Sequence, residues 1–171
     1  MDASFIWQNC NRLNRKKVAS YSVDENIQTW WQAQKKSTSA DHQWLKIDLK
    51  KIITVNSIQV NFADEIEDVK IPENLSLFST IEKYGARYID DRTFPTRWLL
   101  EGNIDDENWF LIKDKSKSET SLAHDFVVIE EGRKIMFVKL TVFEMPYGQS
   151  ACVSGLIIFG KDEEGELPSK V

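Results

Sequence analysis

The sequence is poor in the residues from which metal centres and thiol chemistry are built. Its 171 residues include two cysteines, Cys10 and Cys152, and two histidines, His42 and His124. Their spacing does not match any Cys/His pattern of a zinc site. Neither cysteine lies in a sequence context typical of a catalytic nucleophile. The sequence therefore predicts neither a zinc centre nor a Cys–His nucleophile pair.

Long apolar runs and secretion signals are also missing. No run approaches the roughly 20 apolar residues of a membrane-spanning helix. The N-terminal Met1–Trp7 (MDASFIW) lacks the basic and apolar regions of a signal peptide. If the parent protein is exported to an extracellular or periplasmic location, we expect this chain to be an excised piece of it.

Basic residues show no excess that would favour a polyanionic partner. The formal net charge is −5, and Lys and Arg are scattered among acidic residues. Nucleic-acid-binding proteins usually carry a basic face, because neutralising phosphates drives their affinity. Anionic membranes select for basic clusters for the same reason. We therefore expect no nucleic-acid partner and disfavour membrane lipid.

Recognisable catalytic motifs are absent from the sequence. It holds no nucleophile elbow, phosphate loop, His-Glu-x-x-His motif or dinucleotide fingerprint. The 27 acidic residues do not by themselves define the spaced carboxylate pair of a glycosidase. The chain is also short for the barrel and propeller scaffolds that usually carry that chemistry. We predict that this domain is not an enzyme.

Short strands dominate what is present. Helical periodicity is weak, whereas alternating or β-branched runs recur between polar turns. This pattern predicts an all-β, antiparallel sandwich or barrel. The expected strands are Trp44–Leu49, Ile52–Phe62, Arg97–Gly102, Trp109–Ile112, Asp125–Ile129, Ile135–Phe143 and Val153–Phe159.

Two segments depart from the strand pattern. Residues 63–96 form a connection too long for an ordinary hairpin, with a candidate short helix in Leu75–Lys83. Such a loop either carries binding residues or covers a sheet edge. The charged residues 161–171 lack apolar anchors and are predicted to be a disordered tail or linker. We expect one domain over residues 1–160.

Several motifs occur in the order found in a known family. The chain resembles discoidin domains, also called coagulation factor V/VIII type C domains, over roughly residues 15 to 160. This resemblance implies a jelly-roll sandwich of the galactose-binding-like type, which mostly binds sugars or membrane lipids. The motifs are Asp24 with Thr29 and Trp31, Trp44–Leu49 (WLKIDL), Val55–Val60, Trp98–Trp109, Phe137–Thr141 and Val153–Gly160.

A narrower resemblance points to accessory modules of enzymes. The segments Asn9–Asn14, Val60–Asp64, Ala123–Phe126 and Met145–Gly148 are similar to discoidin-like modules at the C-terminus of bacterial glycoside hydrolases. The modules of family forty-three β-xylosidases and arabinofuranosidases are an example of such modules. The resemblance implies a carbohydrate-binding module whose partners are a glycan or polysaccharide and a catalytic domain in the same parent chain.

The resemblance also implies a calcium site and a disulfide. Family members often hold a structural calcium with the Asp and Thr that correspond to Asp24 and Thr29, helped by an acidic residue on the last strand. Here Glu25 replaces the usual glycine, and Gly155 stands where the acid is expected. Calcium takes six to eight oxygen ligands, so its presence stays open. Cys10 and Cys152 either form the family's terminal disulfide or are two small buried residues.

Sugar recognition needs a flat aromatic ring beside hydrogen-bonding groups. Trp31, Trp44 and Trp109 are interpreted as core aromatics, and Asp48 as structural. Trp30 is adjacent to Trp31, so in extended backbone the two rings point in opposite directions. The predicted carbohydrate-binding residues are Trp30, His42, Arg87, Tyr88 and Tyr147.

Two further functions stay open from the sequence. A structural or protein-interaction domain would pack against a catalytic partner and bind no sugar. Adhesion to a membrane or cell surface would need apolar side chains at loop tips, for which Trp30 and Phe94 are the candidates. Resemblance in fold does not by itself establish the ligand.

Overall fold

Alternation of apolar and polar side chains produces strands that bury every second residue. In the computed structural model, Leu45 and Ile47 are buried, whereas Trp44, Lys46 and Asp48 are half-buried on the other side of the same strand. The structure describes residues 6–8, 18–26, 28–34, 37–64 and 95–162. Its strands are β1 (Ile6–Gln8), β2 (Trp31–Gln32), β3 (Gln43–Phe62), β4 (Arg97–Asn103), β5 (Phe110–Asp114), β6 (His124–Glu144) and β7 (Cys152–Lys161).

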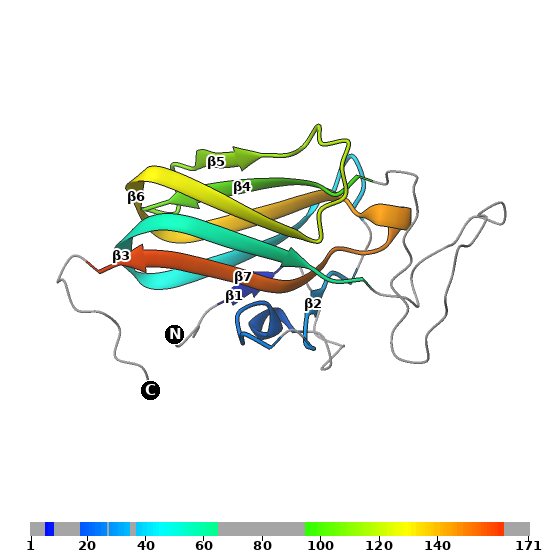
Figure 1. Ribbon diagram of the computed structural model, residues 1–171, viewed down its shortest axis with the longest axis horizontal. Helices are drawn as coiled ribbons and strands as arrows, with labels where there is room; N and C mark the ends of the chain where they lie inside the picture. The colour runs from blue at the N-terminus through cyan, green and yellow to red at the C-terminus, as the bar shows by residue number, and fades with distance from the viewer. Residues whose placement is uncertain (1–5, 9–17, 27, 35–36, 65–94, 163–171) are drawn as a thin grey trace.

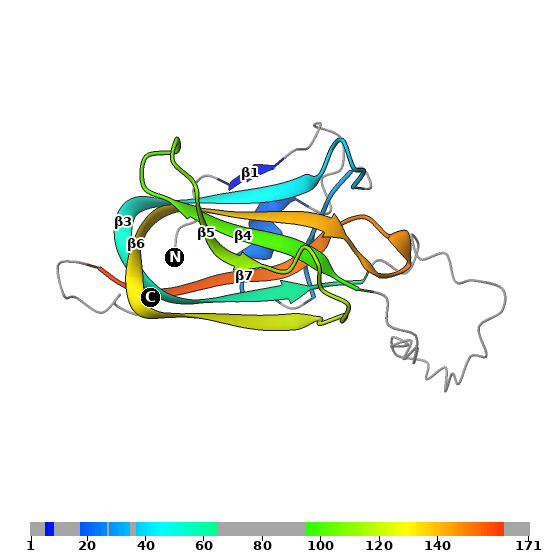
Figure 2. The ribbon, with the colours of Figure 1, turned by 90° about the horizontal axis from the view of Figure 1, so that it is seen from above.

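The strands form an antiparallel β-sandwich in two layers (Figures 1 and 2). Every strand pair is antiparallel, in the order β2-β7-β3-β6-β4-β5, and β1 pairs with β3. The predicted fold class is confirmed. Within the described ranges, two short 3-10 helices, η1 (Ala19–Ser22) and η3 (Pro146–Gly148), lie in the connections. No helix among the described residues is long and apolar enough to cross a membrane.

The long strands β3 and β6 pass from one layer into the other. We call layer A the set of β1, β4, β5 and the segments 43–49 of β3 and 135–144 of β6. Layer B contains β2, β7 and the segments 53–62 of β3 and 124–129 of β6. The sequence predicted two separate strands in each of these regions. The structure joins them, because the backbone bends sharply and the β3–β6 pairing resumes after register shifts between Asp48 and Ile53 and between Val55 and Ser57.

Residues with left-handed backbone angles make the bend. Lys50 has φ 67° and Gly132 has φ 67°, and the Asp48 carboxylate accepts a hydrogen bond from the Lys50 backbone N–H at 2.8 Å. A Cβ atom on Gly132 would lie 2.8 Å from the Thr54 side chain. Position 132 therefore requires glycine both for its backbone angle and for the close approach of β3.

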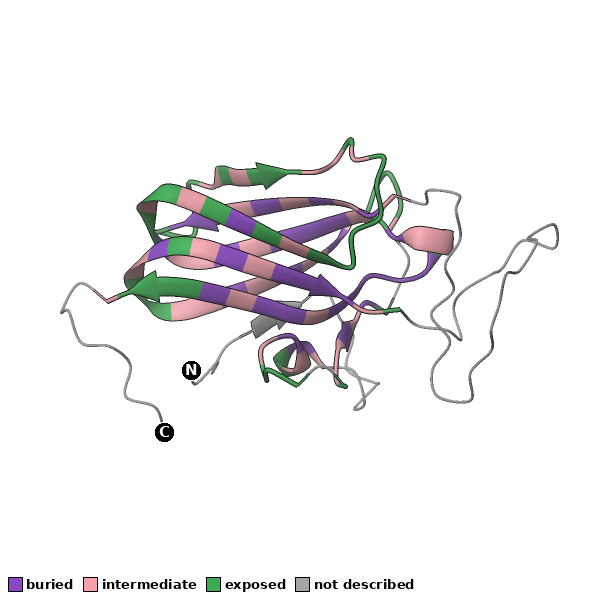
Figure 3. Cartoon of the chain, in the orientation of Figure 1, coloured by how far each residue is buried: buried purple, intermediate pink, exposed green. Residues whose placement is uncertain are grey.

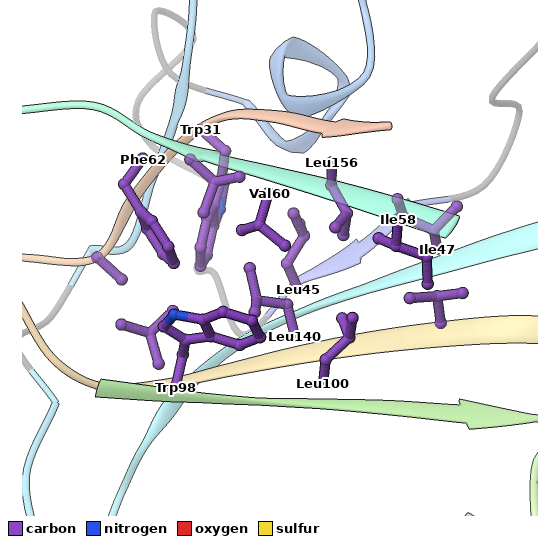
Figure 4. Packing of buried hydrophobic residues seen from close by; sticks show 14 of the residues in the cluster. Trp31, Leu45, Ile47, Ile58, Val60, Phe62, Trp98, Leu100, Leu140 and Leu156 are labelled. Carbon is purple, nitrogen blue, oxygen red and sulfur yellow. The ribbon is translucent and has the colours of Figure 1, made fainter. Parts of the chain in front are cut away.

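The core lies between the two layers (Figures 3 and 4). Trp31 is fully buried, as predicted, and Trp98 is 2% exposed. Phe62 packs on Trp98 with ring centroids 6.3 Å apart. The interpretation of Trp44 and Trp109 as core residues is wrong: both are half-buried. Trp44 is only half-buried because it points, like Lys46, to the outer face of layer A.

Some predictions fall on residues outside the described part of the chain. These are the candidate helix in Leu75–Lys83, Arg87, Tyr88 and Phe94, Cys10, and the tail beyond residue 162. Cys152 is described and is buried. Strand β7 continues to Lys161, one residue past the predicted domain boundary.

Candidate functional site

An open groove of about 400 Å³ lies on the outer face of layer A. Two half-buried tryptophans, one from β3 and one from just before β5, contribute to its walls. The remaining lining side chains are mostly polar. The residues that line the groove are His42, Trp44, Lys46, Asp106, Trp109, Lys139 and Thr141.

The register between β3 and β6 brings four of these residues together. Trp44 lies opposite Thr141, and Lys46 lies opposite Lys139. Residues directly opposite in an antiparallel pair point to the same face, and so do residues two apart along a strand. The four side chains therefore form a two-by-two block on the outer face of layer A.

The turn between β4 and β5 brings Asp106 and Trp109 over this block. Asn103 Oδ1 accepts hydrogen bonds from the backbone N–H groups of Asp105 and Asp106, at 2.5 and 2.6 Å. Asp105 Oδ1 then accepts from the N–H groups of Glu107 and Asn108, both at 2.9 Å. Asn and Asp favour such turns because their short side chains bond to nearby backbone. Two successive side-chain anchors fix the turn.

The second anchor has a distinctive protonation behaviour. Hydrogen bonds from Asn108, through its backbone N–H and its side-chain amide, and from the Glu107 N–H lower the pKa of Asp105 to about 2. Hydrogen bonds to a carboxylate stabilise its charged form. The Asp105 carboxylate is therefore charged over the whole physiological range, and the turn keeps its acceptor.

Ion pairs and cation–π contacts tie the turn to the sheet. Lys46 Nζ donates to both carboxylate oxygens of Asp106, at 2.7 and 2.8 Å. Lys139 Nζ lies 2.9 Å from the Glu101 carboxylate and 4.8 Å from the centroid of the Trp109 ring. An ammonium over an indole face is attracted by the ring quadrupole. Lys139 thus helps to hold the indole of Trp109 beside the groove.

His42 is the one predicted carbohydrate-binding residue that lines the groove. Its ring packs edge-on against Phe143, with centroids 4.6 Å apart. Its Nδ1 atom is buried and finds no hydrogen-bond partner within the described parts of the chain. His42 therefore contributes a half-buried ring to the lining of the groove.

The other predicted site residues do not gather at the groove. Trp30 directly precedes β2 and Tyr147 lies in η3; both are half-buried, and neither is among the lining residues. Tyr147 has a left-handed φ of 58°. Arg87 and Tyr88 lie outside the described residues. A role in sugar binding for these four residues stays a prediction.

Sequence reasoning missed Trp44 and Trp109 as groove residues, although one signal was available. Trp44 alternates in step with Lys46 and Asp48, which marks it as outward-facing. Trp109 follows a five-residue polar turn, and its position depends on how that turn folds. The sequence holds no comparable signal for Trp109.

The turn of Asp24 and Thr29 is closed by its own hydrogen bonds. The Thr29 hydroxyl donates to Asp24 Oδ2 at 2.6 Å, and the Asn26 N–H donates to Asp24 Oδ1 at 3.0 Å. No cluster of three His, Cys, Asp or Glu side chains occurs among the residues the structure describes. The resemblance implies that backbone carbonyls would supply further oxygens, because calcium takes six to eight. Calcium here stays a prediction, tested by comparing melting temperatures in EGTA and in calcium chloride.

A second surface feature lies on the outer face of layer B. Phe126, Val128 and Phe159 are 54%, 63% and 44% exposed. The rings of Phe126 and Phe159 contact one another, with centroids 5.9 Å apart. We call these three residues the layer B patch. Exposed apolar residues that adjoin one another on a sheet are a feature of interaction surfaces.

Comparison with known proteins identifies the architecture. No protein-family model matches the chain. No curated protein matches it either. The solved structure of the carbohydrate-binding module CBM32-6 of Clostridium perfringens is similar, with a TM-score of 0.63 and 15% identity, covering 94% of this chain and 96% of that module. The CBM32 module of AlyQ, in complex with 4,5-unsaturated mannuronic acid, is also similar. Its TM-score is 0.60 at 14% identity, covering 92% of this chain and 95% of that module.

A third similar structure is a chitosan-binding module of a chitosanase/glucanase from Paenibacillus sp. IK-5, in complex with chitotriose. Its TM-score is 0.63 at 13% identity, covering 92% of this chain and 97% of that module. All three likenesses extend over nearly the whole of both chains. The chain therefore has the jelly-roll β-sandwich fold of these three carbohydrate-binding modules.

Proposed function

We propose that the protein is a non-catalytic carbohydrate-binding module and that the groove on layer A binds the glycan. The observation that carries the proposal is the pair of half-buried indoles, Trp44 and Trp109, in one open groove with hydrogen-bonding side chains. The fold shared with sugar-binding modules supports the same function.

The groove has the chemistry that a sugar ring requires. The apolar C–H face of a pyranose packs on an aromatic ring, and its hydroxyls need donors and acceptors around the edge. Lys46 and Lys139 supply N–H donors, and Asp106 supplies acceptor oxygens. The Thr141 hydroxyl can serve as either. Lys46, Lys139 and Thr141 lie on two paired strands, and Asp106 lies in an anchored turn. These positions keep the side chains fixed before a ligand arrives, which lowers the entropic cost of binding.

The biological setting that we propose is accessory to catalysis. The domain belongs to an exported bacterial glycoside hydrolase and tethers that enzyme to its polysaccharide, outside the cell or in the periplasm. Weak binding by the module raises the effective concentration of the attached catalytic domain at its substrate. The resemblance to modules of family forty-three enzymes and the carbohydrate-binding neighbours support this setting.

A glycan array followed by isothermal titration calorimetry tests the binding function. We expect the wild-type domain to bind at least one glycan, and Trp44→Ala and Trp109→Ala each to weaken that binding about tenfold or more, because stacking on each indole is lost. Phe126→Ala is the matched control, because it removes an exposed aromatic ring from the opposite layer. Failure to bind any glycan, or equal binding by all four proteins, would contradict the assignment of the groove.

The layer B patch favours a second candidate function. A domain that packs against a catalytic partner without binding sugar would use an exposed apolar face, and Phe126, Val128 and Phe159 provide one. Under this alternative, Phe126→Ala would weaken association with the catalytic domain, and the two groove variants would not. The same set of variants therefore separates the two functions.

A further inference from the structure

Two lysines lie directly opposite one another at the base of the groove. Lys46 on β3 pairs with Lys139 on β6 in the antiparallel ladder. Like charges at directly opposite positions repel and destabilise a sheet. The side chains are also only 16% and 28% exposed, so water screens them less than it screens surface charges. Such a pair requires compensation from nearby anions.

Each lysine receives one carboxylate from the β4–β5 hairpin. Lys46 pairs with Asp106 at 2.7 Å, and Lys139 pairs with Glu101 at 2.9 Å. Two ammonium charges and two carboxylate charges sum to zero. Each lysine that lines the groove is therefore neutralised by one carboxylate, from the lining residue Asp106 and from Glu101, which is paired with Lys139 beside the groove.

We propose that the groove selects uncharged glycans and discriminates against uronate, sulfated and amino sugars. This inference rests on the proposed function, because it specifies the class of sugar that the same site takes. An acidic sugar placed beside either lysine would also lie near Asp106 or Glu101, and like-charge contacts at an interface cost several kcal/mol. The ammonium group of an amino sugar would likewise be repelled by the two lysines.

The identity of the cations supports the same conclusion. Carboxylates and sulfates are best recognised by arginine, whose planar guanidinium donates two parallel hydrogen bonds. Among the described residues that line the groove, none is arginine. Both cationic groups are lysines that already donate to carboxylates. The groove therefore lacks the group that usually confers selectivity for acidic ligands.

The paired charges still leave hydrogen-bonding capacity for neutral hydroxyls. An ammonium has three N–H donors, and a carboxylate has about four lone-pair sites. In its ion pair, each group uses part of this capacity. A sugar hydroxyl can accept a hydrogen bond from Lys46 and donate one to Asp106 at the same time. Neighbouring hydroxyls on a neutral sugar ring therefore suit a groove in which N–H donors and carboxylate acceptors lie side by side.

The test uses oligosaccharides that share a backbone and differ in charge. One pair is oligogalacturonate and its fully methyl-esterified form; the other is chitosan oligosaccharide and its N-acetylated counterpart. These pairs are placed on the array beside neutral oligosaccharides and titrated at low salt and at about 1 M NaCl, where the Debye length is about 3 Å. We expect the charged member of each pair to bind at least about tenfold more weakly than the neutral member. Binding of neutral glycans should be insensitive to salt.

Asp106→Asn is the informative variant. It leaves Lys46 without its carboxylate, and asparagine tolerates the left-handed φ of 66° at this position. We expect oligogalacturonate binding to rise several-fold in this variant and to fall at high salt. Glu107→Gln is the matched control: it makes the same change in net charge in the same exposed turn, at a residue that does not line the groove.

The outcomes separate this inference from the proposed function. The inference is supported if the wild type binds only neutral glycans and if Asp106→Asn, but not Glu107→Gln, gains binding to oligogalacturonate. Wild-type binding to a charged oligosaccharide as tight as to its neutral partner overturns it and leaves the carbohydrate-binding function standing. An equal gain in both variants would also overturn it, because net charge would then explain the effect. Absence of binding to every glycan overturns both proposals.

Discussion

Trp44 and Trp98 lie on opposite faces of layer A, paired with consecutive residues of β6. Trp44 is opposite Thr141 and points outward into the groove, whereas Trp98 is opposite Val142 and is buried in the core. Two tryptophans that are close in space therefore have different roles. The alternation of a β-strand, by which successive residues face opposite sides, accounts for the difference.

Their substitutions should have very different effects on stability. We expect Trp98→Ala to lower the free energy of unfolding by about 3–5 kcal/mol, because it leaves a cavity in the core. Trp44→Ala should cost about 1 kcal/mol, because the groove is already open to water. Urea denaturation of both variants measures this difference. Equal losses would show that Trp44 supports the core after all.

Acid should weaken the β4–β5 turn through Asp105. The pKa of this carboxyl is lowered from 3.8 to about 2 in the folded protein by its hydrogen bonds to Asn108 and Glu107. A carboxyl whose pKa is lower in the folded than in the unfolded protein stabilises the fold. This stabilisation is complete at pH values above the unfolded-state pKa, and it is lost as the pH falls from about 4 to about 2. Asp105→Ala should therefore melt below the wild type at pH 7, and the gap should narrow across that acidic window.

Melting curves of both proteins between pH 7 and pH 2 provide the measurement. Asp105→Asn is a useful comparison, because it keeps an acceptor oxygen and removes the charge. A constant gap at all pH values would indicate that the charged state of Asp105 is irrelevant and that only packing was lost.

Gly132 and Gly148 allow backbone strain to be separated from steric clash. Both have positive φ, 67° and 61°. A Cβ on Gly132 would meet the Thr54 side chain at 2.8 Å, whereas nothing lies within 4 Å of one on Gly148. Gly148→Ala should cost about 1–2 kcal/mol from the backbone alone. Gly132→Ala should cost more, because β3 and β6 must separate at the bend; equal losses in denaturation would remove the clash from the explanation.

Glu25 is a site where glycine should improve stability. Its φ of 58° places an ordinary L residue in the left-handed region, and its side chain is exposed. Glycine adopts this angle without the steric cost of a Cβ, although its unfolded chain is more flexible. We expect Glu25→Gly to raise the free energy of unfolding by up to about 1 kcal/mol. Glu25→Ala keeps the Cβ and should bring no gain; a gain as large as that of glycine would point to charge instead.

The strands could be predicted from local patterns with good accuracy. Each predicted run lies within an observed strand, apart from Trp109, which directly precedes β5. Local patterns missed the two short strands β1 and β2, and they missed the continuity of β3 and β6 across the bend. Lys50 and Gly132 make that bend with left-handed angles, and the sequence read them as breaks between strands because turn residues and bend residues look alike.

The candidate site was predicted less well, for reasons that differ between residues. His42 was predicted on its chemistry and does line the groove. Trp44 was assigned to the core because it matches a core aromatic of the resembling family and its alternation partners were taken to be apolar. It in fact alternates with Lys46 and Asp48. Trp109 could not be placed, since its position depends on the turn anchored by Asn103 and Asp105.

The sequence by itself determined the longer strands, the side of the sheet on which most of their residues fall, and the class of fold, because these depend on alternation over a few neighbouring residues. Only the tertiary structure decided that Lys46 faces Lys139 and that Asp106 and Trp109 cover them. Those relationships depend on the register between strands far apart in sequence and on the path of one turn. Charge balance in the groove is a consequence of that register, and no local pattern contains it.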